Sequence, residues 1–326
     1  MSATENRAST RHLVDPAAAP ALDVFPPFTF TLETLPEIRE RMTTPVPGAP
    51  APAELFPGVT LTEHRVPGED GDPDVRVLRY SPAGRAATAP ALVWIHGGGF
   101  IIGTAEQEDL TCRRIATETG AVIVSVDYRL APETPAPGSV HDCYAALRWL
   151  HEQADALGVD SSRIAVGGNS AGGGLAACLA ILARDRAEFP VSFQLLIYPM
   201  LDDRTVTTEQ PNPYTGEFIW TPESNRFGWT SLLGREPGGE KVSPYASAAR
   251  VETVTGLPPA YLSVGALDLF LDEDIAYAGR LLRAGVPTEL HVYPGGYHGF
   301  NMVPDAWMTK AYFRDFIGAL GRHFNR

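Results

Sequence analysis

The segment RIAVGGNSAGGGLAACLAILARDR (163–186) places a serine between two runs of different character. The first run, 163–167, is short, apolar and closed by glycine, which is typical of a buried strand, and the second, 173–186, favours a helix. Small residues on both sides of Ser170 allow a tight strand-to-helix turn that leaves the hydroxyl exposed at the carboxyl edge of a sheet. Ser170 is therefore a candidate nucleophile, and a glycine-rich turn with an idle serine is the alternative.

Short apolar runs like the first one recur along the chain. They alternate with helical patterns, which indicates strands buried on both faces of a parallel sheet. The runs are ALVWI (91–95), AVIVSV (121–126), FQLLIY (193–198), AYLSVG (260–265) and ELHVY (289–293). Ahead of them, 59–66 and 75–80 alternate in polarity and predict an antiparallel opening pair. An apolar stripe in 141–158 predicts a helix that ends at Gly158. We expect an α/β fold with a mostly parallel central sheet flanked by helices.

The composition divides the chain into four parts. Residues 1–57 are rich in Ala and Pro and are typical of an arm or lid ahead of the main fold. Residues 58–200 and 241–326 carry the strand and helix patterns of the main domain. Residues 201–240 belong to an interval too long for one crossover, and an aromatic helical pattern starts within it at 218. We interpret 201–240 as an insertion that covers one end of the sheet.

A second glycine-rich turn, His96-Gly97-Gly98-Gly99-Phe100, follows the strand pattern 91–95. Its glycines free backbone N–H groups to point at one spot, where they can stabilise developing negative charge. We expect Gly97, Gly98 and the amide of Ala171 to be oxyanion donors, and His96 to brace the loop. A flexible turn or a phosphate loop is the competing interpretation, although no P-loop lysine or dinucleotide motif accompanies the glycines.

A serine nucleophile needs a general base, and the base needs an orienting acid. Of eight histidines, only His298 lies in a loop just after a late strand, where the order Ser, Asp, His of an α/β-hydrolase expects the base. Asp268 directly follows the strand pattern 260–265 and is our candidate acid. Asp202 and Asp203 are second choices. Three further rivals lie in the first turn of the next predicted helix, where acidic residues favour the helix dipole: Asp272, Glu273 and Asp274.

The charge balance excludes several classes of partner. The 326 residues include 26 basic and 39 acidic side chains, a net charge of −13, which argues against nucleic-acid and anionic-membrane partners.

The cysteines have no metal-ligand spacing, so we expect buried, reduced thiols and no metal site; they are Cys112, Cys143 and Cys178. Without a signal peptide or a long apolar span, the sequence predicts a cytoplasmic protein.

From about Gly58 onward, the chain resembles the bacterial hormone-sensitive-lipase family of α/β-hydrolase carboxylesterases. The resemblance rests on HGGGF (96–100), DYRLAPE (127–133), GNSAGG (168–173), DLFLDE (268–273) and HGF (298–300), in the family's order. It implies ester hydrolysis through an acyl-serine, without a cofactor, beneath a cap made of the N-terminal segment and the insertion. It also implies that Asp127, Arg129 and Glu133 brace the sheet edge, for which an ordinary surface salt bridge is an equal alternative. Asn169 and Leu271 depart from the family's commonest Asp and frequent Arg.

Together these patterns predict a serine carboxylesterase that acts on short- to medium-chain acyl esters. Ser170 is the expected nucleophile, His298 the base and Asp268 the acid. Phe218 and Trp220 of the insertion are candidates for the substrate pocket, or they simply pack the cap, as Phe227 and Trp229 also can. A non-catalytic small-molecule receptor, and an acyltransferase or amidase with the same triad, stay open as alternatives. The unguarded last strand, 288–293, suggests a homodimer.

Overall fold

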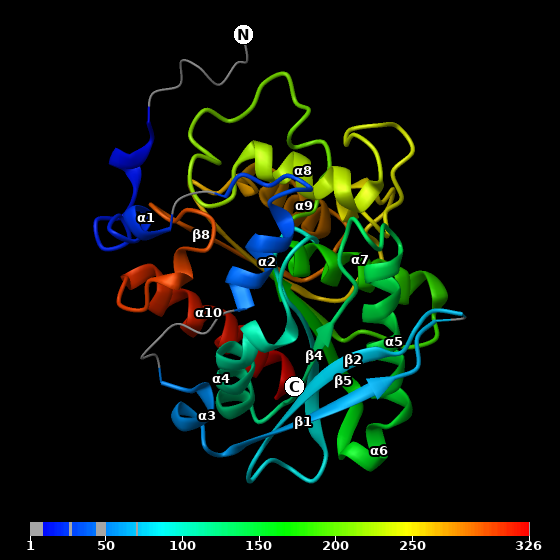
Figure 1. Cartoon of the computed structure of the whole chain (residues 1–326). Coiled ribbons are helices and arrows are strands. Elements are labelled where there is room, and N and C mark those ends of the chain that lie inside the picture. Colours follow the sequence, from blue (N-terminus) through cyan, green and yellow to red (C-terminus); the bar gives the residue numbers. More distant parts are fainter. Residues whose placement is uncertain (1–8, 26–27, 44–49, 70, 326) are drawn as a thin grey trace.

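The computed structural model describes residues 9–25, 28–43, 50–69 and 71–325, so parts of the proline-rich arm (1–8, 26–27 and 44–49) lie outside the described residues. Its centre is an eight-stranded sheet in the order β1-β2-β4-β3-β5-β6-β7-β8 (Figure 1). The strands are β1 (Val59–Val66), β2 (Val75–Pro82), β3 (Ala89–Ile95), β4 (Val122–Asp127), β5 (Val159–Asn169), β6 (Phe193–Ile197), β7 (Ala260–Gly265) and β8 (Thr288–Tyr293).

The directions of the strands confirm the expected mostly parallel sheet with an antiparallel start. β1 pairs antiparallel with β2, β2 pairs antiparallel with β4, and the later neighbours are all parallel. β3 shows why the inner strands have continuous apolar runs. All seven of its residues are buried, with Leu92 and Trp94 in the core on one face and Val93 and Ile95 in the core on the other.

Two groups of helices cover the two faces of the sheet. α4 (Asp109–Thr119) and α10 (Trp307–Phe324) share a core with one face, and α5 (Gly138–Glu152), α7 (Ala171–Arg186) and α9 (Leu271–Arg283) share a core with the other. The helix predicted to end at Gly158 is divided, because α5 ends at Glu152 and a short α6 (Ala154–Leu157) follows. Gly158 then ends α6 in the left-handed conformation, with φ 61°.

The segments outside the sheet and its helices gather largely at one end of the molecule. The residues just ahead of α2 (Leu35–Thr43) contact α8 (Pro222–Leu233), because Phe30 lies 6.2 Å from Phe227 and Ser224 Oγ donates to the Phe28 carbonyl at 3.4 Å. Arg39 of α2 donates hydrogen bonds to the carbonyls of Ile101 and Ala131, at 2.8 and 2.9 Å. Short elements complete the described chain: η1 (Arg11–Leu13), α1 (Ala21–Val24), α3 (Pro52–Leu55), η2 (Ala105–Glu108), η3 (Ala248–Arg250) and η4 (Phe300–Met302).

Within the described ranges, no helix combines the length and the apolar character that crossing a membrane requires. The same residues contain no group of three or more His, Cys, Asp or Glu side chains placed to hold a metal ion. The three cysteines are free and buried.

Candidate active site

Ser170 lies at the turn from β5 into α7, in a backbone conformation that L residues rarely adopt (φ 55°, ψ −122°). Such a conformation costs free energy and persists only where the surroundings fix it. The Ser170 N–H donates to the Ile197 carbonyl at 2.8 Å, and the Ser170 carbonyl accepts from Met200 N–H at 2.9 Å. Gly168 and Gly172 both pack against the Ile95 carbonyl, with no room for a β-carbon. The small residues quoted from the sequence are therefore required by close backbone approach.

The serine, the histidine and the aspartate predicted from the sequence form one chain of hydrogen bonds. Ser170 Oγ lies 2.9 Å from His298 Nε2, and His298 Nδ1 lies 2.9 Å from Asp268 Oδ2. The second oxygen of Asp268 accepts the Phe270 N–H at 3.0 Å, which fixes the carboxylate. The three residues are 5, 7 and 0% exposed, respectively. Because Asp268 can only accept from Nδ1–H, the lone pair of Nε2 faces the serine hydroxyl.

The rival acids lie elsewhere. Asp203 is paired with Arg250 at 2.7 Å, and Asp202 with Arg204 at 2.8 Å. Glu273 accepts the Leu201 N–H at 2.6 Å. Asp272 and Asp274 both belong to α9, as the sequence predicted, but Asp274 is completely buried. Among the ion pairs of the described residues, Asp268 is the one carboxylate that contacts the base.

The loop after β3 lies directly against the serine. A β-carbon on Gly97 would come within 3.3 Å of Ser170 Cβ. In the part of the chain that the structure describes, no hydrogen bond engages the backbone N–H groups of Gly97, Gly98 or Ala171. These donors therefore remain available to a ligand. His96 is buried, its Nδ1–H donates to the Gly97 carbonyl at 2.7 Å, and burial lowers its pKa, so it stays neutral and braces the loop.

Aromatic rings enclose the base. Tyr198 and Phe270 present edge-on rings 5.0 and 5.2 Å from the His298 ring, and Trp220 lies 6.3 Å from it. The Trp220 indole N–H donates to Oδ1 of Asn225, which belongs to α8, at 3.0 Å. Trp220 itself is 6% exposed. Among the ring contacts of the described residues, the segment 201–240 therefore reaches the triad through the Trp220 indole.

A strained turn delivers that indole. The Trp220 N–H donates to the Phe218 carbonyl at 2.7 Å, which closes a three-residue turn around Ile219. Ile219 has a φ of 63°, in the left-handed region that β-branched residues avoid. Phe218 itself stacks edge-on with Tyr297, the neighbour of the base, at 6.1 Å. The two candidate pocket residues thus lie on either side of a strained residue next to the active site.

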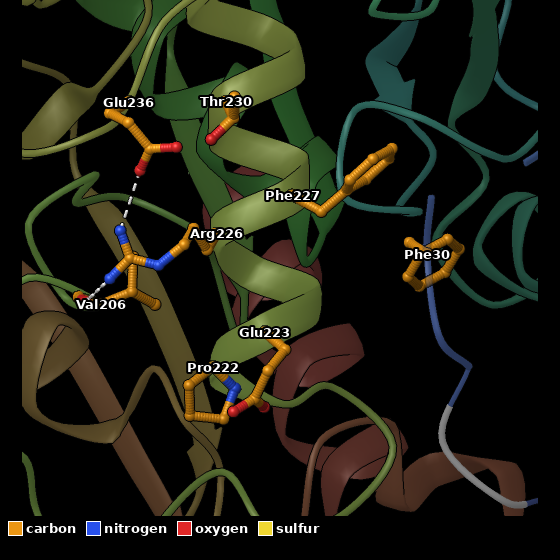
Figure 2. Close-up of a pocket in the computed structure, with 8 residues that line it drawn as sticks. All are labelled: Phe30, Val206, Pro222, Glu223, Arg226, Phe227, Thr230 and Glu236. Carbon is orange, nitrogen blue, oxygen red and sulfur yellow. Dashed lines mark hydrogen bonds and ion pairs between the residues drawn. The ribbon is translucent and has the colours of Figure 1, made fainter. Parts of the chain in front are cut away.

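The other insertion aromatics have different surroundings. Trp229 is completely buried against Phe100, at 5.1 Å. Phe227 lies near Phe30 of the N-terminal segment, with ring centres 6.2 Å apart. Phe30 and Phe227 line a cavity of about 410 Å³ beside α8, together with Arg226 and Glu236. Figure 2 shows the two rings on one side of the α8 ribbon and Arg226 and Glu236 on the other. Neither Phe227 nor Trp229 makes a ring contact with His298 among the described residues.

The DYRLAPE residues form ion pairs that connect separate segments. Asp127 pairs with Arg76 at 3.3 Å, and Arg129 with the buried Asp142 at 2.7 Å. Glu133 pairs with Arg39 of α2 at 2.7 Å. The pair between Arg39 and Glu133 joins the N-terminal segment to the segment that follows β4.

Three side chains at the site were not predicted from the sequence. Glu108 is buried and accepts a hydrogen bond from Asn169, the residue before the serine, at 3.1 Å. Tyr198 contacts the ring of His298, and Asn225 accepts the hydrogen bond from the Trp220 indole. Their partners lie far away in the sequence or belong to the insertion, where no motif marks single residues. The tight turn after a strand would have drawn attention to Tyr198 alone.

Comparison with known proteins places these features in a family. A model described as the alpha/beta hydrolase fold matches residues 92–302. Esterase LipI of Mycobacterium tuberculosis is 35% identical over 305 residues, 92% of each chain. Carboxylesterase NlhH of the same species is 38% identical over 293 residues, 88% of each chain. A solved structure titled bacterial heroin esterase is 42% identical with a TM-score of 0.87, covering 97% of this chain and 99% of the other.

Proposed function

This chain belongs to the α/β-hydrolase fold family, in its hormone-sensitive-lipase-like branch, and from that premise we propose that Ser170, His298 and Asp268 hydrolyse carboxylic esters through an acyl-serine intermediate. It is a carboxylic ester hydrolase, because relatives that match most of its length are named esterases. The observation that supports the assignment of residues is the unbroken chain of hydrogen bonds, 2.9 Å at each step, from serine to histidine to aspartate.

The chemistry runs in two halves. His298 Nε2 takes the proton of Ser170 Oγ while the oxygen attacks the acyl carbon, and the same proton then goes to the departing alcohol. The acyl group stays on the serine. Water next attacks the acyl carbon with His298 again as the base, which forms a tetrahedral intermediate. Its collapse, with the proton returned from His298 to Ser170 Oγ, releases the acid and restores the serine hydroxyl. Asp268 stabilises the imidazolium in both halves.

The backbone N–H groups of Gly97, Gly98 and Ala171 supply the oxyanion hole in this proposal. Gly97 lies against the serine, and none of the three amides has an acceptor among the described residues. Donors already in place where charge develops lower the barrier without reorganisation, and removing one such donor typically costs about 10² to 10³ in rate.

The position of Trp220 over the catalytic base favours esters of short- to medium-chain acids as substrates. The Trp220 ring lies against His298, and Phe218 contacts the ring of Tyr297, the residue that precedes His298. Each methylene that enters an apolar pocket contributes about 0.8 kcal/mol until the pocket is full. Catalytic efficiency should therefore rise over the first carbons and fall once the acyl chain meets the indole. We propose an optimum between about two and eight carbons, because a roofed pocket of the usual volume, roughly a few hundred Å³, accommodates a small apolar acyl group.

The division into cap and catalytic parts is part of the same proposal. Residues 1–57 and 201–240 supply the cap, and 58–200 with 241–326 supply the catalytic domain. The ion pair from α2 to Glu133 and the indole on the base support this division. We also propose a cytoplasmic location, supported by three free buried thiols, which persist in a reducing compartment.

Strand β8 is the edge of the sheet and supports a homodimer. It pairs only with β7 in the described sheet, and Val292 on it is 40% exposed. An edge without Lys or Pro is open to pairing with a second copy. Sedimentation velocity should show a dimer that Val292→Lys dissociates, whereas Leu282→Lys, at a 55% exposed position on α9, leaves it intact. A wild-type monomer at micromolar concentration would contradict the dimer.

A panel of substrates tests the proposed activity. The purified chain should release p-nitrophenol from p-nitrophenyl acetate, butyrate and octanoate, and it should leave the matching p-nitroanilides intact. With added short alcohols, free acid should remain the main product. Faster cleavage of the anilides would establish an amidase, and an ester as the main product would establish an acyltransferase. Binding of these esters without turnover would establish a receptor.

A further inference from the structure

Glu108 is a buried carboxyl behind the nucleophile turn that the proposed mechanism leaves without a role. It ends the short helix η2 and is 9% exposed. Its Oε1 accepts a hydrogen bond from Asn169 Nδ2 at 3.1 Å, across 61 residues of sequence. Burying a carboxyl costs free energy unless the group makes compensating interactions. Its hydrogen-bond partner directly precedes Ser170, which suggests that the interaction supports the turn that carries the nucleophile.

Asn169 links this carboxyl to both halves of the reacting centre. It is the last residue of β5, so its backbone leads directly into the strained Ser170. Its other side faces the glycine loop: a β-carbon on Gly97 would lie 3.0 Å from the Asn169 carbonyl oxygen and 3.3 Å from Asn169 Oδ1. The amide side chain is thus held between Glu108 and Gly97, with its nitrogen bonded to the former.

We propose that Glu108 is a positioning residue that acts through Asn169 to hold the Ser170 turn in place against Gly97. The inference rests on the proposed function, because it concerns the same nucleophile. The strained turn needs fixed neighbours, and its backbone hydrogen bonds to Ile197 and Met200 hold the side that faces β6. Glu108, the residue directly before α4, supplies a further hydrogen bond to the residue that precedes Ser170.

The surroundings of Glu108 determine how the pair responds to pH. The titratable groups that face it are Cys112 of α4, Tyr128 after β4, Tyr198 after β6 and Tyr312 of α10, and none of these carries a positive charge. Trp94 and Thr111 add polar but uncharged neighbours. Burial raises the pKa of Glu108, and its Oε1 can accept the amide hydrogen of Asn169 in either the protonated or the ionised form of the carboxyl.

Asn169 suits this carboxyl because its amide can donate a hydrogen bond to either form of Glu108 and has no proton to lose near neutral pH. An Asp at this position would place a second carboxyl at hydrogen-bond distance from Glu108. Two carboxyls this close share one proton and resist losing it. Once it is lost, the pair becomes repulsive and the turn loses its support. The combination of Asn169 with Glu108 therefore keeps the support independent of pH.

Four variants of the full chain separate this role from simple packing: Glu108→Gln, Glu108→Leu, Asn169→Asp and the double variant Glu108→Gln with Asn169→Asp. Glu108→Gln keeps an acceptor and should retain kcat within about 3-fold. Glu108→Leu leaves the Asn169 amide unpaired and should lower kcat by about 10- to 100-fold. KM for p-nitrophenyl butyrate should stay within about 2-fold in both, since neither side chain touches the substrate.

The pH profile supplies the readout that packing alone would not change. The kcat of Asn169→Asp, relative to that of wild type, should fall by at least about 10-fold between pH 6 and pH 9. The double variant should restore the wild-type profile, because the Gln amide can donate to the Asp carboxylate at any pH. Melting temperatures of all four variants identify any loss that comes from unfolding.

The outcomes are distinguishable. Equal kcat values for Glu108→Leu and wild type would overturn the positioning role, as would an Asn169→Asp profile parallel to that of wild type. If Glu108→Leu fails to fold, the profiles of Asn169→Asp and of the double variant decide the matter alone. Wild type that neither hydrolyses p-nitrophenyl butyrate nor reacts with a fluorophosphonate would instead refute the proposed function.

Discussion

The indole of Trp220 lies directly on Gly99, so closely that a β-carbon on the glycine would overlap the ring. Gly99 has a φ of 59°, and its carbonyl leaves no room for a side chain at Gly228 of α8 either. The cap and the glycine loop are thus packed face to face across two glycines. A change in the position of the roof must therefore be felt at the loop that we assign to the oxyanion hole.

This contact predicts coupling between positions 99 and 220. Gly99→Ala should lower kcat/KM by about 10- to 100-fold, because the added methyl pushes the indole away and the backbone conformation disfavours alanine. In a Trp220→Ala background, the same change should cost much less. A double-mutant cycle on p-nitrophenyl butyrate measures the difference. Additive effects of the two substitutions would show that the contact does not transmit the change.

Trp220 should also set the length of acyl chain that the site accepts. Trp220→Ala opens the roof over His298, so the optimum should move by at least about two carbons toward longer chains. Phe218→Ala, which removes a ring that contacts Tyr297 instead, should shift it less. Steady-state kinetics with p-nitrophenyl acetate through palmitate give the profiles. A wild-type optimum at twelve carbons or more would contradict the short-chain proposal, and unchanged profiles in both variants would remove these residues from the pocket.

The sequence was most informative where structure follows from short local patterns. The bounds of the strand runs agree with the observed bounds to within four residues, because a buried strand needs an unbroken apolar run. Ser170, Asp268 and His298 were recognisable as candidates because each follows a strand of the sheet, and parallel strands bring their carboxyl ends to the same edge. The family and its ester hydrolysis followed from several motifs in a fixed order and are confirmed.

The sequence was least informative where contacts join distant segments. The pairing of Glu108 with Asn169 spans 61 residues, and no periodicity announces it. Asp274 reads as an ordinary acidic residue in the first turn of a helix, yet it is fully buried with both carboxyl oxygens unpartnered among the described residues. Burial of a charged side chain depends on what the rest of the chain places around it. Local pattern carries no record of that.

Asp274 should make the protein less stable as the pH rises. Burial raises its pKa well above the usual value, so the folded chain keeps a proton there that the unfolded chain has lost. Unfolding then releases a proton, and stability falls with increasing pH above about 4. Asp274→Asn should raise the melting temperature at pH 8.5, by about 2 °C or more, and should change it less at pH 5.

The matched control for this measurement is Asp305→Asn, at a fully exposed side chain. It should leave the difference in melting temperature between pH 5 and pH 8.5 as it is in wild type. Glu273, whose pKa burial also raises, keeps part of the dependence in the Asp274 variant. A pH dependence equal to that of wild type in Asp274→Asn would show that this carboxyl does not hold the proton.

The acid role can be tested by exchanging one carboxylate at a time. Asp268→Asn removes the charge that stabilises the imidazolium and should lower kcat by about 10⁴-fold. Asp202→Asn should leave kcat within about 3-fold of wild type, since that carboxylate pairs with Arg204 rather than with the base. Steady-state kinetics with p-nitrophenyl acetate give the kcat values of the two variants. The reverse ranking would move the acid role to the segment after β6.

The most direct test of the whole account is the identity of the acylated residue. Treatment with a fluorophosphonate, followed by intact-protein and peptide mass spectrometry, should give one adduct per chain, on Ser170. Ser170→Ala should take up no label, keep its melting temperature and lose about 10⁴- to 10⁶-fold in ester turnover. An adduct on another residue, or more than a tenth of wild-type turnover in folded Ser170→Ala, would contradict Ser170 as the nucleophile.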